Sequence, residues 1–101
     1  MKVLFMVRKP YFDAIVAGTK NEEIRRATKR WETVMDHLFP PPLGGNIGVF
    51  LCGRSVHRRK IVDVEECPSA ETHLDRPLSK QGRKDIGTGP VIVFLLGDVV
   101  A

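Results

Sequence analysis

The sequence predicts one small α+β domain, built as a mixed, largely antiparallel β-barrel with two or three short helices. Its 101 residues are enough for a single hydrophobic core. Short apolar runs separated by Gly and Pro are typical of short strands. Helical patterns follow only some of these runs, whereas a doubly wound sheet would have a helix after every strand. A small barrel therefore fits the pattern better.

The first two elements are a strand and a short helix. Residues 2–8 are apolar on both alternating faces, which predicts a strand covered on both sides. Pro10 suits the first turn of a helix, where its missing N–H needs no partner. Residues 11–17 have helical apolar spacing, and Gly18 stands where helices commonly end in a left-handed glycine.

Residues 19–26 are polar, with Ile24 as the one large apolar side chain. Side chains of a strand alternate between its faces. If Ile24 faces the core, Glu23 and Arg25 share the opposite, open face. Taken by spacing alone, this pair is more typical of a structural ion pair than of a ligand site, and surface pairs contribute little to stability.

A second helix is expected at residues 28–39, with Thr28 as its N-cap. Its apolar stripe consists of Trp31, Val34, Met35 and Leu38. The three prolines at 40–42 should end it.

The rest of the chain predicts strands at residues 47–52, 56–66 and 91–96, the last buried on both faces, and a short helix near 79–84. Within the middle strand, Val62 and Val64 alternate with Asp63 and Glu65, which indicates a half-exposed strand with both valines on one face.

The charge distribution points to an anionic partner. The chain has 16 Lys and Arg against 12 Asp and Glu, a net charge of +4. Many of the cations fall into two clusters: Arg25, Arg26, Lys29 and Arg30, and then Arg54, Arg58, Arg59 and Lys60. Basic patches of this kind can bind the phosphates of nucleic acid. The alternative is that both are solvated faces that keep the protein soluble.

Other classes of protein have little support in the sequence. The apolar runs are too short to span a bilayer, and no secretory cleavage site follows the first run. Cys52 and Cys67 are expected to be partly buried thiols in a reducing cytoplasm. Since His37, His57 and His73 are widely spaced and none pairs with a nearby cysteine, we expect no metal site. No cofactor is expected, and the protein is predicted to be a monomer.

One segment carries a family resemblance. The run from Lys9-Pro10 through Gly18-Thr19-Lys20 to Glu23-Ile24-Arg25 resembles the signature Gly-x-Lys-x-x-Glu-x-Arg of the ASCH (activating signal cointegrator homology) family. Residues 26–38 are similar to small bacterial and phage members, and residues 89–97 resemble the closing strand of the family. The resemblance implies a PUA-like β-barrel with a cleft between barrel and helices, faced by Lys20, Glu23 and Arg25.

The resemblance also implies a class of function. The family is thought to bind RNA, and some members are reported as enzymes. One branch resembles amidohydrolases that act on acylated cytidine, but it has a threonine where this chain has Glu23. Another member has been linked to RNA cleavage. The proposed hydroxyl nucleophile of the first branch is therefore missing here.

Chemistry and resemblance together predict an RNA- or nucleotide-binding site. The expected ligand-binding residues are Lys9, Gly18, Lys20, Glu23, Arg25 and Trp31. The cations would bind phosphate, and Glu23 would accept hydrogen bonds from a base amine or a ribose hydroxyl. Tyr11 or Trp31 could stack on a base, although each is more often a packing residue. The alternative is a small hydrolase acting on a modified nucleoside, or a weak ribonuclease, in which Lys20 and Glu23 transfer protons. A protein-interaction domain is a third reading.

Overall fold

The computed structural model describes residues 1–38 and 45–101. Within these residues the elements are, in order, β1 (Lys2–Met6), α1 (Lys9–Ala17), β2 (Glu22–Arg26), α2 (Lys29–Leu38), β3 (Asn46–Cys52), β4 (Ser55–Cys67), α3 (Ala70–Leu74), α4 (Lys80–Ile86) and β5 (Val91–Val99). The strands form one sheet in the order β1-β3-β4-β5-β2. It is parallel between β1 and β3 and antiparallel elsewhere.

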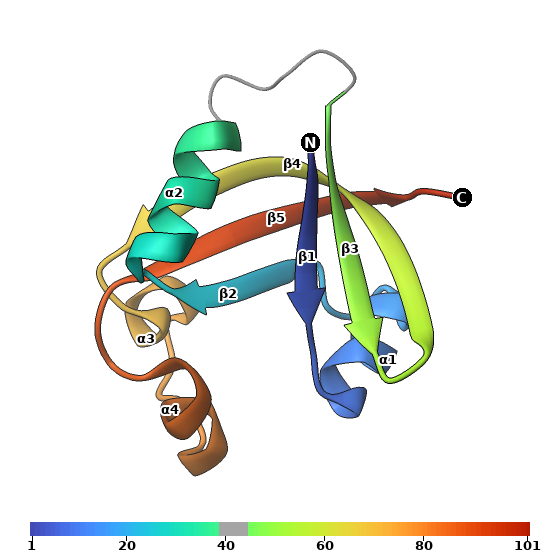
Figure 1. Cartoon of the computed structure of the whole chain (residues 1–101). Coiled ribbons are helices and arrows are strands. Elements are labelled where there is room, and N and C mark those ends of the chain that lie inside the picture. The colour runs from blue at the N-terminus through green and yellow to red at the C-terminus, as the bar shows by residue number, and fades with distance from the viewer. Residues whose placement is uncertain (39–44) are drawn as a thin grey trace.

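The sheet curls into a half-barrel, with β1 and β2 as its two edges (Figure 1). The predicted α+β class and the largely antiparallel barrel are confirmed. The short helix expected near 79–84 is α4, and Ser79 caps it by accepting the N–H of Gly82. α3 was not predicted, because five residues are too few to establish a helical period. None of the described helices is long and apolar enough to cross a membrane.

The core lies on the inner face of the curled sheet, and β5 is buried on both faces as predicted. Ile92 and Phe94 belong to the inner core, which also contains Phe5 and Phe50. Val91 and Val93 alternate with them and join a smaller cluster on the outer face, which α3 and α4 cover.

α2 packs its predicted apolar stripe against the inner core. Leu38 is buried, and the indole of Trp31 stacks on the Phe5 ring with centroids 5.3 Å apart. Thr28 caps this helix, since its hydroxyl oxygen accepts the N–H of Trp31 at 3.4 Å. The prolines at 40–42, predicted to end the helix, lie outside the described residues.

The prediction that β1 is covered on both sides is wrong. Val3 and Phe5 are buried, but Leu4 is 55% and Met6 79% exposed. β1 is an edge strand that pairs with β3. The core covers its inner face and leaves its outer face in contact with solvent.

The predicted alternation in β4 is also wrong at one point. Val64 is buried, but Val62 is 58% exposed. The register against β5 is irregular between Ile61 and Asp63, as in a β-bulge. Two consecutive residues therefore face outward, and Ile61 and Val64 point into the core.

Candidate functional site

A buried arginine fixes the loop that precedes β2. Arg59 is 6% exposed, although it was predicted to be part of a nucleic-acid-binding surface, and that prediction is wrong. Its guanidinium donates to the carbonyls of Gly97 (2.6 Å), Ile15 (3.2 Å) and Lys20 (3.4 Å), and to the side-chain oxygen of Asn21 (2.8 Å). These contacts hold the C-terminal turn of α1 and the Lys20–Asn21 backbone against the barrel.

β2 turns its charged residues inward. Glu23 and Arg25 pair with Phe94 and Ile92 of β5, so they share the inner face of the sheet. That they share a face is confirmed, but the expectation of an open face is wrong, because their side chains are only 8% and 24% exposed. Ile24 points the opposite way and packs on the outer cluster rather than on the main core. Both faces of β2 are covered, so the apolar character of Ile24 does not indicate which face points into the main core.

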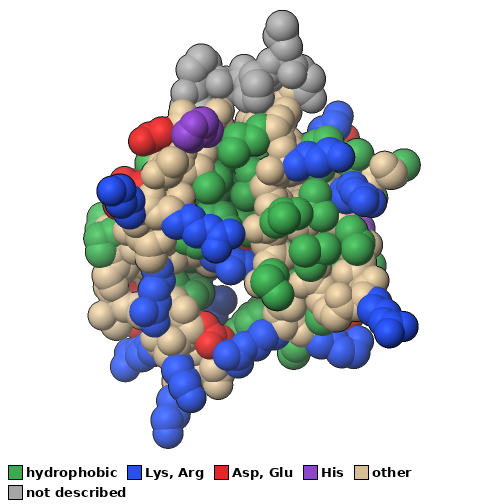
Figure 2. Space-filling view, in the orientation of Figure 1, with side chains coloured by type: hydrophobic (Ala, Val, Ile, Leu, Met, Phe, Trp, Pro, Cys, Tyr) green, Lys and Arg blue, Asp and Glu red, His purple; other side chains and the backbone are tan. Residues whose placement is uncertain are grey.

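These side chains line a pocket between the end of β1, the start of α1, β2 and α4. Its cavity volume is about 270 Å³. The space-filling view shows a hollow between the α1 side and the α4 side of the molecule, with Lys and Arg side chains around it (Figure 2). The lining residues are Met6, Val7, Arg8, Tyr11, Lys20, Glu23, Ile24, Arg25, Arg26, Asp85 and Ile86. Four of them are cationic and two are acidic, so positive charge is in excess.

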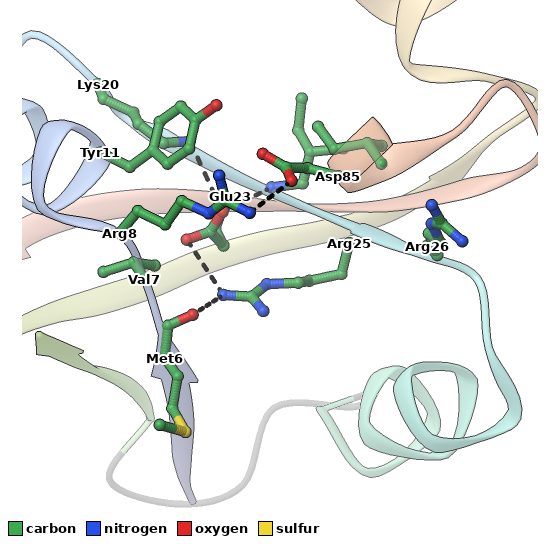
Figure 3. Close-up of a pocket in the computed structure, with 11 residues that line it drawn as sticks. Met6, Val7, Arg8, Tyr11, Lys20, Glu23, Arg25, Arg26 and Asp85 are labelled. Carbon is green, nitrogen blue, oxygen red and sulfur yellow. Dashed lines mark hydrogen bonds and ion pairs between the residues drawn. The ribbon is translucent and has the colours of Figure 1, made fainter. Parts of the chain in front are cut away.

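Glu23 lies between the two central cations of the pocket (Figure 3). Its carboxylate oxygens are 3.7 Å from Lys20 Nζ and 3.7 Å from Arg25 Nη2. Arg25 also donates to the Met6 carbonyl at 3.0 Å, which links the two edge strands, and its guanidinium lies 5.3 Å from the Trp31 ring centroid. Lys20 donates to the Glu22 carbonyl at 2.5 Å. The pocket charges are therefore held in place by backbone contacts as well as by one another.

The pocket retains unused hydrogen-bonding capacity. Among the described residues, Glu23 Oε2, Arg25 Nε and Asp85 Oδ2 are buried and have no hydrogen-bond partner. Asp85 Oδ1 pairs with Arg8 across the pocket at 3.0 Å. Unpartnered polar atoms cost free energy when they are buried. A polar ligand in this pocket could offset that cost.

Three predicted ligand residues do not line this pocket. Lys9 pairs with Asp13 on the exposed surface of α1, at 3.1 Å. Gly18 serves as the predicted cap of α1, with φ of +78°. Trp31 packs against Phe5 in the core, so its assignment as a ligand residue gains no support from the cavity.

The remaining predicted basic residues divide between two regions. Arg26 lines the pocket and donates to the Lys84 carbonyl at 3.0 Å. Lys29 and Arg30 are exposed in the first turn of α2, where the Arg30 guanidinium lies over the Trp31 ring. The exposed residues Arg54, Arg58 and Lys60 lie on the β3–β4 hairpin and are not pocket residues.

Sequence reasoning missed Arg8, Asp85 and Ile86 as pocket residues. Asp85 is 60 or more residues away from the signature in the sequence, and no local pattern connects α4 with β2. Tyr11 was considered only as a possible stacking residue. In the structure it lines the pocket, with Lys20 Nζ 5.8 Å from its ring centroid.

A second group of polar side chains lies near α3. The sequence suggested that no histidine pairs with a nearby cysteine, and this is wrong for His73, whose Nδ1 is 3.8 Å from Cys67 Sγ. The short turn between β4 and α3 brings them together across six positions of the chain. Cys52 and Cys67 are both free and half-buried, as predicted.

Comparison with known proteins identifies the fold. No family model and no curated protein matches the sequence. The crystal structure of a mutant form of the ZmASCH protein from Zymomonas mobilis is similar, with a TM-score of 0.65 and 22% sequence identity. The match covers 96% of this chain and 68% of the other. The chain therefore has the same fold as the ZmASCH protein, a small α+β half-barrel.

Proposed function

We propose that this domain binds single-stranded RNA by taking one nucleotide into the pocket between α1, β2 and α4. The observation that carries the proposal is the meeting of Lys20, Glu23 and Arg25 in a cavity of about 270 Å³. Small-molecule sites usually measure about 300–1,000 Å³, and this cavity lies just below that range, so it has room for one nucleotide at most. A duplex would not enter it.

The cations of the pocket provide the phosphate-binding part. Arg8, Lys20, Arg25 and Arg26 outnumber the two carboxylates, so the pocket attracts an anion. Arg25 is already oriented by the Met6 carbonyl. A guanidinium held in this way loses little conformational freedom when it binds phosphate through two hydrogen bonds.

Glu23 and Tyr11 provide the base-binding part. Glu23 Oε2 has no hydrogen-bond partner among the described residues, and an ionised carboxylate can only accept hydrogen bonds. It therefore suits the exocyclic amine of cytosine, adenine or guanine. Tyr11 offers an aromatic face at the same pocket, on which a base can stack.

A second cavity lies next to the pocket at the end of β2. The two cavities share the lining residues Arg26 and Ile86, and the second is also lined by Thr28 and Pro90. This cavity ends beside the first turn of α2, which carries Lys29 and Arg30. The phosphates that flank a bound nucleotide could follow this basic path.

The test is the salt dependence of binding to a fluorescently labelled single-stranded RNA, measured by anisotropy. The double variant Lys20→Gln/Arg25→Gln should bind on the order of tenfold more weakly or worse. Its slope of log K against log salt should fall by about 1.4, since each cation contributes about 0.7 for single strands. The matched control is Arg54→Gln/Lys60→Gln, which removes the same charges from the β3–β4 hairpin. Equal losses in both double variants would contradict the site.

Base preference tests the role of Glu23 separately. Oligomers of cytidine or adenosine should bind a few-fold to about tenfold more tightly than oligouridine, because uracil has an oxygen where cytosine has an amine. Glu23→Gln should remove this preference, since an amide both donates and accepts. A preference that persists in Glu23→Gln would show that another residue contacts the base.

A small hydrolase or weak ribonuclease is the second candidate. It is favoured by the Lys20 Nζ to Glu23 Oε1 distance of 3.7 Å within the pocket, because a paired cation and carboxylate can exchange a proton with a substrate. The test is turnover of acylated nucleosides and of labelled RNA by pure protein. Activity that survives Lys20→Ala would belong to another site or to a contaminant.

A further inference from the structure

Three side chains that can ligate a metal ion converge on the outer face of the sheet, whereas Glu23 and Arg25 of the pocket face inward. Glu65 and Cys67 are two positions apart near the end of β4 and pair with Val93 and Val91, whose side chains form the outer cluster. They therefore share that outer face. α3 follows shortly after β4 in the chain (Figure 1). Its residue His73 lies close to both Cys67 and Glu65.

The distances between the donor atoms suit one small cation. His73 Nδ1 is 3.8 Å from Cys67 Sγ and 3.6 Å from the nearest oxygen of Glu65. All three donor atoms lie within 4.8 Å of one another. Tetrahedral zinc has bonds of about 2.3 Å to sulfur and about 2.0–2.1 Å to nitrogen, which places neighbouring ligand atoms roughly 3.5 Å apart. A shift of a few tenths of an ångström to about 1 Å would complete the site.

A fourth residue orients the histidine. His73 Nε2 lies 2.9 Å from Glu22 Oε2, at hydrogen-bonding distance. When Nε2–H donates to this carboxylate, the lone pair of Nδ1 faces Cys67 and Glu65. Metal-binding histidines usually have such a carboxylate partner, which fixes the ring and makes the ligating nitrogen more basic.

The local charge also favours a cation. Two carboxylates, those of Glu22 and Glu65, lie 2.9 and 3.6 Å from the His73 ring nitrogens, and no Lys or Arg among the described residues forms an ion pair with either of them. A bound divalent cation would neutralise the carboxylates and stabilise the thiolate.

We propose that Glu65, Cys67 and His73 bind Zn²⁺, with solvent as a fourth ligand and Glu22 as the residue that positions His73. Cysteine, histidine and carboxylate together match the ligand preference of zinc rather than of Mg²⁺ or Ca²⁺. The thiol proton of Cys67 passes to solvent when the metal binds. The metal fastens α3 to the end of β4.

The test is titration of chelator-treated protein with Zn²⁺, with Co²⁺ as a spectroscopic probe. Free Zn²⁺ at a hundred times its Kd should raise the melting temperature by about 10–20 °C. Co²⁺ should give the visible absorption of a tetrahedral site together with a thiolate-to-metal charge-transfer band. Cys67→Ser should abolish that band. Cys52→Ser, which changes the other half-buried thiol, should keep it.

Glu22→Gln separates the positioning role from ligation. It should weaken Zn²⁺ binding by about 10- to 100-fold while the thiolate band remains. Melting of each metal-free variant checks that it is folded. The proposal is overturned if Zn²⁺ leaves the melting temperature of the folded wild-type protein unchanged, or if Cys67→Ser binds as tightly as wild type. Either result would mean that His73 only bridges two carboxylates.

Discussion

Replacing Arg59 with methionine tests how the loop of the pocket is held in place. Methionine keeps most of the volume of the side chain and removes the guanidinium. The change deletes four hydrogen bonds, and three of their acceptors are backbone carbonyls near the end of α1, in the following loop and in β5. Acceptors that stay buried without a donor are costly.

The expected loss follows from two opposing contributions. Hydrogen bonds to a charged group contribute about 1.5–3 kcal/mol each to stability. The two short bonds of Arg59, to Gly97 at 2.6 Å and to Asn21 at 2.8 Å, should account for most of its contribution. Against this, burying a guanidinium costs several kcal/mol, which the variant recovers. We expect Arg59→Met to be destabilised by about 3 kcal/mol, in line with the removal of one partner from other buried charge networks.

Urea denaturation followed by circular dichroism measures this loss. With a slope of about 1–3 kcal/mol/M, the midpoint should fall by about 1–3 M. The matched control is Arg58→Met, the exposed neighbour on the same strand, which should stay within about 0.5 kcal/mol of wild type. Equal stability of Arg59→Met and Arg58→Met would refute the reasoning that these hydrogen bonds hold the loop.

Three further changes test the packing, the caps and the pH dependence. Gly48→Ala should lower the free energy of unfolding, measured in urea, by about 1–3 kcal/mol, because the added Cβ would lie 3.1 and 3.2 Å from two buried phenylalanine rings. A variant as stable as wild type would show that the rings can move to make room. Thr28→Ala removes the cap of α2 and should lower the free energy of unfolding by about 1 kcal/mol, whereas Thr28→Ser keeps a hydroxyl at the cap and should keep most of that stability. Burial, and secondarily the charge of Arg59, lowers the pKa of His57 below its ordinary value. His57 therefore binds a proton more readily in the unfolded chain than in the folded one. The stability that comes from keeping His57 neutral is present above about pH 6.5 and is lost as the pH falls below that value. Urea midpoints at pH 7.5 and 5.5 should differ less in His57→Asn than in wild type, and an equal difference would contradict this assignment.

The barrel could be predicted from the sequence because its strands and long helices have clear periods. The buried run of β5 and the apolar stripe of α2 are local patterns, and both are confirmed. The inward side of β2 could not be predicted in the same way. Because α3 and α4 cover the outer face of the sheet, an apolar residue such as Ile24 could have packed on either face of β2.

The site was predictable only where its residues are close in the chain. Lys20, Glu23 and Arg25 lie within six positions, whereas Asp85 joins them through α4. Arg59 was predicted as part of a basic surface cluster. It lies two positions from the buried Ile61 on the same strand, and this alternation could have identified it as inward-facing. His73 and Cys67 have no recognised zinc spacing, and only the turn before α3 brings them together.

The most direct test of the proposed function is mapping of amide chemical shifts during titration with a short single-stranded cytidine oligomer. Binding in the pocket predicts the largest shifts at residues 6–11, 20–26 and 85–86, with little change at Arg54 in the β3–β4 turn. Saturable shifts centred on the β3–β4 hairpin, with the pocket residues unchanged, would contradict it.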